Sequence, residues 1–178
     1  RDNRYGNSVS NPCLLQCGDR WRLYFSASLV FVEDCGFCEP LYIACAQSHS
    51  VDGPYTIMNE SIIDPASEGP KGVIGAGSMK VLSLDDGYIA LQNKIYRDSS
   101  GKSRSAIFLL SSRDGLAWRQ AAEEALIAPQ SGWMASHVYA CDCRFNSTDS
   151  TWYLYFNARD KWTISEGKER IGRVCAKV

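Results

Sequence analysis

The chain has 178 residues, enough for one ordinary domain that removes roughly two thirds of its unfolded surface from water. Its 19 Lys and Arg residues balance 20 Asp and Glu residues, so the formal net charge of -1 provides no single-sign field for a polyanion or an anionic membrane. Nucleic acid is therefore a poor partner, and no apolar run approaches the roughly 18 residues of a membrane-spanning helix.

Short apolar segments recur along the chain with a shift of about 65 residues, three to a repeat and always in the same order. The first segments are NPCLLQC (11–17), SMKVLSL (78–84) and SHVYACDC (136–143). The second segments are WRLYFSA (21–27), YIALQNK (88–94) and WYLYFNA (152–158). The third segments are LYIACAQS (41–48), AIFLLSS (106–112) and IGRVCAKV (171–178).

Each segment is rich in aromatic and β-branched residues and is bounded by Gly, Asp, Asn or Ser, which indicates β-strands. Gly18 and Gly87 lie between first and second segments, where they can adopt the positive φ of a tight hairpin. The sequence therefore predicts an all-β fold of three antiparallel repeats. A β-sandwich whose aromatic residues alternate by chance is the alternative.

The repeats are predicted to cover about 10–68, 75–128 and 133–178, all within a single domain or fragment of residues 1–178. The turns SVDGPY (50–55) and SRDGLAW (112–118) follow the third segments of the first two repeats. The connection RQAAEEALIAPQ (119–130) is rich in Ala and Glu, and we expect it to form one helical turn or a bent loop.

Eight cysteines leave three interpretations open: a secreted disulfide framework, a zinc site, or reduced thiols in a cytoplasmic protein. CGFC (35–38) supplies one close pair but no second pair follows it, so neither a metal nor a cofactor is predicted. The reduced state is favoured, and with it, slightly, a cytoplasmic location.

Antiparallel sheets repeated radially describe a β-propeller. The S-x-D-G turns followed by Pro-Tyr or by Trp, together with the W/Y-x-L-Y-F strands, resemble the five-bladed propellers of glycoside hydrolases of the arabinanase and xylosidase, invertase and levansucrase type. The resemblance covers about residues 10–178. It implies a central funnel lined by the first strand of each blade, a sugar bound at its mouth, and three carboxylates from first strands that act as nucleophile or base, orienting group and general acid.

Glycosidic cleavage needs a protonated acid on the leaving oxygen and an ionised carboxylate opposite it. The first strands here begin instead with Asn11, Ser78 and His137. Three explanations stay open: the acidic blades lie outside this sequence, the scaffold works without acid catalysis, or loops supply the acids. The loop VFVEDCGFCEP, with Glu33, Asp34 and Glu39, is the first place to look.

Two residues are predicted to be catalytic. Asp142 could point its carboxylate into the funnel from the third repeat, or could face water. His137 could bind a sugar hydroxyl or support a carboxylate, or could be a hydrogen-bonded structural residue. The predicted substrate-binding residues are polar side chains on first and second strands and one loop aromatic: Asn11, Ser78, Asn93, Asn157, Arg159 and Trp133.

The resulting hypothesis is a glycoside hydrolase-like protein that acts on oligo- or polysaccharides. The alternative is a non-catalytic carbohydrate-binding or scaffolding propeller, and a redox or metal module on CGFC is the weakest reading. Propellers typically close with four to eight blades. Three repeats therefore predict either a missing remainder of the chain or a second copy in a homodimer. The sugar, the linkage and the stereochemical course stay open.

Overall fold

The computed structural model describes residues 6, 8–58, 61–66, 72–163 and 165–178. Within these residues the only helical element is a single 3-10 turn, η1 (Gly132–Met134), and every other element is a strand. The prediction of an all-β fold is therefore confirmed. No helix among the described residues is long and apolar enough to cross a membrane.

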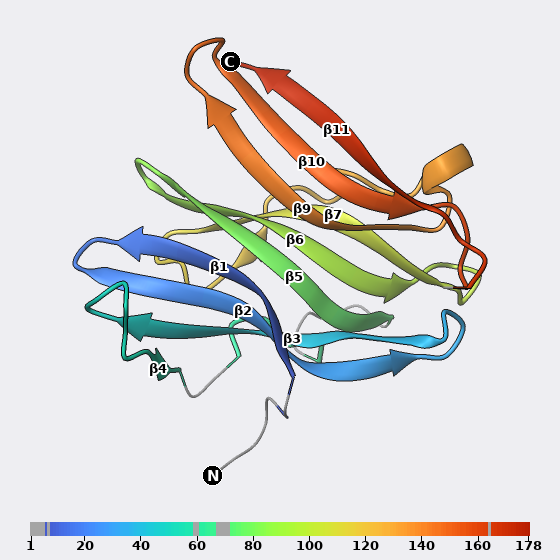
Figure 1. Cartoon of the computed structure of the whole chain (residues 1–178), viewed down its shortest axis with the longest axis horizontal. Helices are drawn as coiled ribbons and strands as arrows, with labels where there is room; N and C mark the ends of the chain where they lie inside the picture. The colour runs from blue at the N-terminus through green and yellow to red at the C-terminus, as the bar shows by residue number, and fades with distance from the viewer. Residues whose placement is uncertain (1–5, 7, 59–60, 67–71, 164) are drawn as a thin grey trace.

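The strands form three antiparallel groups, which we call blades 1, 2 and 3 (Figure 1). Blade 1 contains β1 (Val9–Cys17), β2 (Arg20–Val32), β3 (Phe37–Ser48) and β4 (Thr56–Ile57). Blade 2 contains β5 (Val73–Leu84), β6 (Gly87–Arg97), β7 (Ser103–Ser112) and β8 (Arg119–Gln120). Blade 3 contains β9 (His137–Asn146), β10 (Thr151–Arg159) and β11 (Glu169–Lys177). Residues 59–60 and 67–68 of the first predicted repeat lie outside the described residues.

Each blade places its second strand between its first and third strands, so β2, β6 and β10 occupy equivalent central positions. A single parallel bridge between Ser105 and His137 joins β7 to β9, which makes blades 2 and 3 continuous as one seven-stranded sheet. β5 contacts both β1 and β9, so the first strands of the three blades lie next to one another.

The first strand of every blade carries an irregularity with a positive φ. Asn11, Gly77 and Ala140 have φ values of 50°, 62° and 35°, and the strand pairing shifts register at each of them. A Cβ on Gly77 would collide with the carbonyl oxygen of Asn93, so only glycine fits there. Such β-bulges redirect neighbouring side chains and are frequent beside active sites.

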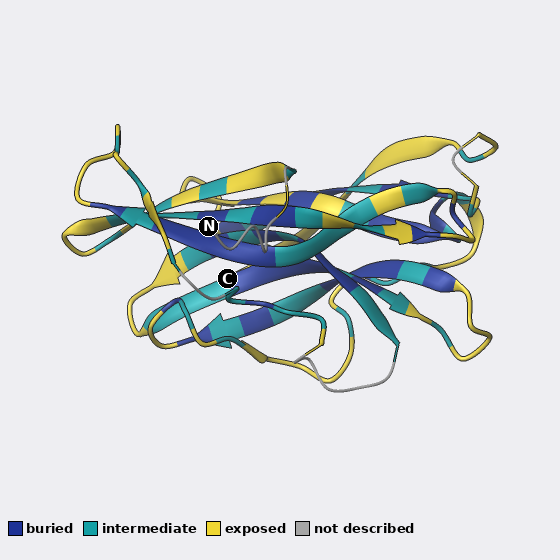
Figure 2. Ribbon diagram, turned by 90° about the horizontal axis from the view of Figure 1, so that it is seen from below, coloured by how far each residue is buried: buried dark blue, intermediate teal, exposed yellow. Residues whose placement is uncertain are grey.

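Two apolar clusters lie between the blades. The cluster between blades 1 and 2 includes Tyr24, Ile43, Cys45, Met79 and Val81. The cluster between blades 2 and 3 includes Leu91, Ile107, Val138, Leu154 and Phe156. Figure 2 shows buried residues in the middle of the strands and exposed residues at the turns. Because burial of one large apolar side chain stabilises a fold by about 1.5–3 kcal/mol, these clusters hold neighbouring blades together.

One local expectation needs correction and a second is decided between its two alternatives. The segment around CGFC is not a long loop, because β2 extends to Val32 and β3 begins at Phe37, leaving a turn at 33–36. The connection 119–130 begins as β8 and later forms a bridge between Ile127 and Ile107, so of the two expected forms it adopts the bent loop and not the helical turn. Pairing with β7 satisfies backbone groups that a helix would otherwise satisfy internally. All eight cysteines are free.

Candidate functional site

A cavity of about 480 Å³ lies where the first strands of the three blades meet the inner part of blade 3. We call it the inner pocket. Its polar lining comes from all three blades: Asn11, Ser78, Lys80, Asp142, Arg144 and Asn157. Ala140, which forms the bulge in β9, also lines it, so the bulged region of that strand faces the pocket.

Four residues that the sequence predicts as site residues line the inner pocket: Asn11, Ser78, Asp142 and Asn157. The Asn11 amide donates hydrogen bonds to the hydroxyl oxygens of Ser10 (3.2 Å) and Ser26 (3.1 Å). The Asp142 carboxylate lies 3.5 Å from the guanidinium of Arg144, and their side chains are 54% and 76% exposed. Both charges therefore remain accessible to a ligand.

Sequence reasoning missed Lys80 and Arg144. The ammonium of Lys80 donates to the Pro12 carbonyl (3.3 Å). The signal that could have found both residues is strand alternation, because residues two apart share a face. Lys80 follows Ser78 and Arg144 follows Asp142 at that spacing.

His137 lies outside the inner pocket and is only 3% exposed. Its Nδ1 is 2.5 Å from the Ser136 hydroxyl and its Nε2 is 3.3 Å from the Cys35 thiol. Burial, together with the positive charges of Arg159 and Arg104, lowers the pKa of His137 to about 4. The imidazole is therefore neutral at neutral pH, and it connects the β2–β3 turn of blade 1 to the start of β9.

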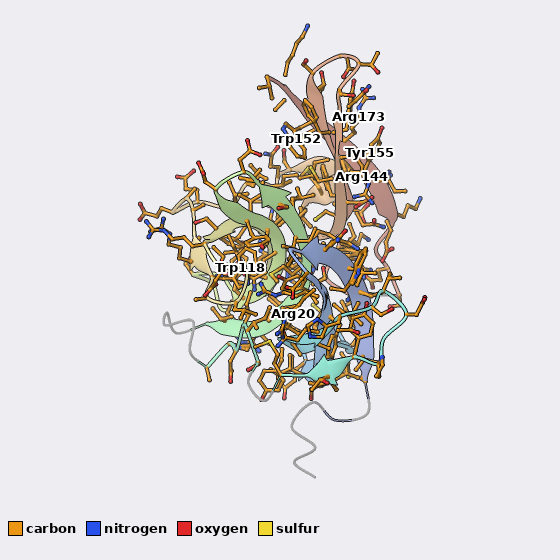
Figure 3. All side chains as sticks on the ribbon, turned by 90° about the vertical axis from the view of Figure 1, so that its left-hand side faces the viewer. Arg20, Trp118, Arg144, Trp152, Tyr155 and Arg173 are labelled. Atoms are coloured by element: carbon orange, nitrogen blue, oxygen red, sulfur yellow. The ribbon has the colours of Figure 1, made fainter. Side chains whose placement is uncertain are left out.

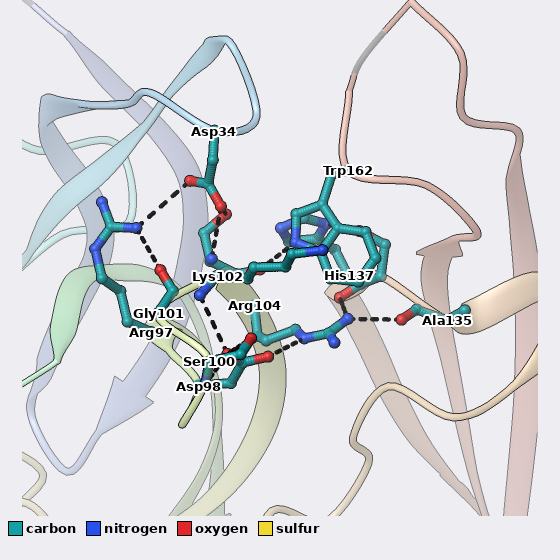
Figure 4. A network of polar contacts seen from close by, with 12 residues as sticks. Asp34, Arg97, Asp98, Ser100, Gly101, Lys102, Arg104, Ala135, His137 and Trp162 are labelled. Carbon is teal, nitrogen blue, oxygen red and sulfur yellow. Dashed lines mark hydrogen bonds and ion pairs between the residues drawn. The ribbon is translucent and has the colours of Figure 1, made fainter.

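Further polar contacts surround this junction of the three blades (Figure 4). The Asp34 carboxylate accepts hydrogen bonds from the backbone N–H (2.7 Å) and hydroxyl (2.9 Å) of Ser103 and lies 3.6 Å from Arg97. The Trp162 indole donates to the Ser103 carbonyl (2.9 Å), and the Arg104 guanidinium lies 4.0 Å from its ring centroid. Asp34 therefore stabilises the junction between blades.

Asn93 and Arg159 also lie outside the inner pocket and are 3% and 2% exposed. The Asn93 amide donates to the Val138 carbonyl (3.0 Å), and Arg159 Nη2 donates to the Thr163 carbonyl (2.7 Å). Trp133 is half-buried and stacks on Phe156, with centroids 6.0 Å apart and planes 18° apart.

Asn93 belongs to a pattern that repeats between blades. In blade 1 the equivalent residue is Ser26, whose hydroxyl donates to the Gly77 carbonyl of blade 2 (2.7 Å). Asn93 makes the same type of contact from blade 2 to the first strand of blade 3. Asn157 is the equivalent residue of blade 3, and among the described residues its side chain has no hydrogen-bond partner.

Glu39 is a second carboxyl near the first strand of blade 3, and it comes from β3 rather than from a loop. It is half-buried, and burial raises its pKa to about 7. Burial also raises the pKa of Tyr139 in β9, with further contributions from the carboxylates of Glu169 and Glu39. Glu39 therefore stays partly protonated at neutral pH, and its charge influences Tyr139 of β9, although it does not line the inner pocket. Among the described residues, no group of three or more His, Cys, Asp or Glu side chains could hold a metal ion.

Comparisons with known proteins identify the architecture. No protein-family model and no curated protein sequence match the chain. Among solved structures, a glycoside hydrolase matches with a TM-score of 0.72 and 10% identity over 94% of this chain and 52% of its own. A family 117 glycoside hydrolase of the marine bacterium Zobellia galactanivorans matches with a TM-score of 0.66 and 14% identity, over 99% of this chain and 55% of its own.

An N-acetylgalactosamine deacetylase from F. plautii, in complex with blood group B trisaccharide, matches with a TM-score of 0.65 and 14% identity, over 93% of this chain and 49% of its own. Family 43 enzymes and a Bombyx mori family 32 β-fructofuranosidase also match. The chain thus spans about half the length of the first structures it matches. It has the fold of part of a five-bladed β-propeller of the glycoside hydrolase type.

Proposed function

We propose that the chain binds saccharide in the inner pocket, as part of a glycoside hydrolase-like propeller. The observation that carries this proposal is the convergence of Asn11, Ser78, Asp142 and Asn157 from strands of three blades onto one cavity. Amides, hydroxyls and a carboxylate are the groups that exchange hydrogen bonds with sugar hydroxyls. The trisaccharide complex of one structural neighbour supports the same class of ligand.

A glycan array followed by titration calorimetry tests this proposal. We expect Asp142→Asn to weaken saccharide binding about tenfold, because a charged acceptor contributes about 1.5–3 kcal/mol to a hydrogen bond. Asp86→Asn is the matched control, since Asp86 is exposed in the β5–β6 turn away from the pocket. A folded chain that binds no saccharide, or an Asp142→Asn variant that binds as well as the parent, would contradict the proposal.

Hydrolysis of a glycosidic bond is the second candidate function, and Glu39 favours it. Hydrolysis requires one carboxylate and one protonated carboxyl. The inner pocket contributes the carboxylate of Asp142. Glu39 of β3 lies outside the lining of that pocket, and its pKa of about 7 leaves it partly protonated at neutral pH, as a general acid must be. Assays on aryl glycosides separate the two candidates. Turnover that Glu39→Gln abolishes would favour an enzyme, whereas saccharide binding without turnover would favour a binding module.

We further propose that the three blades belong to one propeller and that a further blade or a second copy of the chain covers the exposed edge of blade 3. Among the described residues, β11 is exposed along nearly its whole length and pairs only with β10. An unpaired strand edge of this kind can accept a strand from another blade or chain. Light scattering on the purified protein tests the partner: a heavier polypeptide supports further blades, and a dimer of 19.8 kDa chains supports a second copy.

A further inference from the structure

The charged groups of the inner pocket do not balance. Its lining holds two cations, Lys80 and Arg144, and one carboxylate, Asp142. Asp142 is paired with Arg144 at 3.5 Å. Lys80 contacts the Pro12 carbonyl, and no carboxylate of the described residues lies within ion-pair distance of it. The pocket therefore carries an excess positive charge although the whole chain has a formal charge of -1.

A further cation lies at the edge of this pocket. Arg173 of β11 pairs in register with Tyr155, which lines the pocket, and the Tyr155 hydroxyl raises the pKa of Arg173. Figure 3 shows Arg144, Tyr155 and Arg173 on the same side of blade 3, with Trp152 on the other side. A ligand in the pocket would therefore meet positive charge from β5, β9 and β11.

Hydrogen-bond donors also outnumber acceptors in the pocket. The Lys80 ammonium and the Arg144 guanidinium only donate, whereas the Ser78 hydroxyl and the Asn157 amide both donate and accept. Asp142 is the one charged acceptor. A ligand that complements this lining must bring acceptor oxygens and negative charge, together with hydroxyls for the amide and the carboxylate.

We propose that the inner pocket recognises an acidic saccharide, a sugar unit whose carboxylate pairs with Lys80 while its hydroxyls contact Asn157 and Asp142. The inference deepens the proposed saccharide-binding function and rests on it. A neutral sugar would leave the Lys80 charge without a partner, whereas a carboxylate forms short charge-assisted hydrogen bonds with an ammonium or a guanidinium. Nucleic acid fits less well, because its affinity depends on many phosphate contacts.

The test compares oligogalacturonate with the neutral galacto-oligosaccharide of equal length, by calorimetry on the 178-residue chain. We expect the acidic ligand to bind about tenfold more tightly. Lys80→Gln should remove that preference, and Lys80→Arg should retain it. Lys177→Gln is the matched control, because Lys177 is exposed at the end of β11 and does not line the pocket. The preference should also shrink at high salt, since ions screen exposed charges.

The outcomes separate this inference from the proposed function. Equal binding of both ligands, with Asp142→Asn still weakening it, overturns the acidic-saccharide inference and leaves saccharide binding intact. Absence of any saccharide binding by the folded chain overturns both. Preference for a sulfated over a carboxylated oligosaccharide contradicts the carboxylate assignment. If Lys80→Gln does not fold, Lys80→Arg and the salt dependence of the parent chain decide the question.

Discussion

Two buried titratable groups, Glu39 and His137, should act in opposite directions on the pH dependence of folding. Burial raises the pKa of Glu39 from 4.5 to about 7, so between these values the unfolded chain releases a proton that the folded chain keeps. The free energy of unfolding therefore falls as pH rises through this range. Burial lowers the pKa of His137 from 6.5 to about 4, so the unfolded chain binds a proton that the folded chain excludes. The contribution of His137 to the free energy of unfolding therefore falls as pH decreases from about 6.5 towards 4.

The magnitudes follow from the two shifts, each of about 2.5 pH units. A pKa difference of one corresponds to about 1.4 kcal/mol, so each group changes the free energy of unfolding by at most about 3.5 kcal/mol. Because the ranges overlap between about pH 4.5 and 6.5, the two contributions nearly cancel in the parent chain. Glu39→Gln removes one of them and should expose the other.

Urea unfolding followed by tryptophan fluorescence, repeated from about pH 4 to 8, measures this effect. We expect the variant Glu39→Gln to gain stability relative to the parent as pH rises, by up to about 3.5 kcal/mol at the alkaline end. Glu33→Gln is the control, since Glu33 lies exposed in the turn that precedes β3. If the stability difference between Glu39→Gln and the parent is the same at every pH, Glu39 is not desolvated and the argument for a protonated Glu39 carboxyl fails.

Three further predictions concern the blade junctions and the thiols. Asn93→Ala should lower the free energy of unfolding by about 1–2 kcal/mol, because it removes a buried interblade hydrogen bond. Asn157→Ala should change it by less than about 0.5 kcal/mol in this chain, and urea unfolding of both variants compares them. Gly77→Ala should cost at least about 2 kcal/mol in the same assay, since its Cβ meets the neighbouring strand at positive φ, and near-parent stability would refute the bulge. Iodoacetamide should modify exposed Cys38 and Cys175 in the native protein before the four buried cysteines, as peptide mass mapping would show.

The strands could be predicted from the sequence because their signals are local. Aromatic and β-branched residues between Gly, Asp and Asn turns place each strand, and the recurrence of WRLYFSA and WYLYFNA places equivalent strands in equivalent positions. The same repeat pointed to Asn11 and Ser78 as residues of the first strands that face inward, and both line the inner pocket.

Which residues line the inner pocket depended on tertiary structure. Asn93 and Asn157 have the same place in the repeat, yet Asn93 is buried against the next blade and Asn157 lines the pocket. The difference arises because blade 3 packs against the face of blade 2 that carries Asn93, and the local sequence pattern does not predict this packing. The bulge at Ala140 is likewise a property of how β9 pairs with β10.

The sequence by itself therefore determined the repeat and the all-β class, since these follow from residue periodicity and turn chemistry. Tertiary structure alone decided which polar groups are solvated. Burial of Glu39 and His137, and the presence of Lys80 and Asp142 in one pocket, depend on blades that are far apart in the chain. Desolvation and charge pairing depend on distances in space, so a linear sequence does not contain them explicitly.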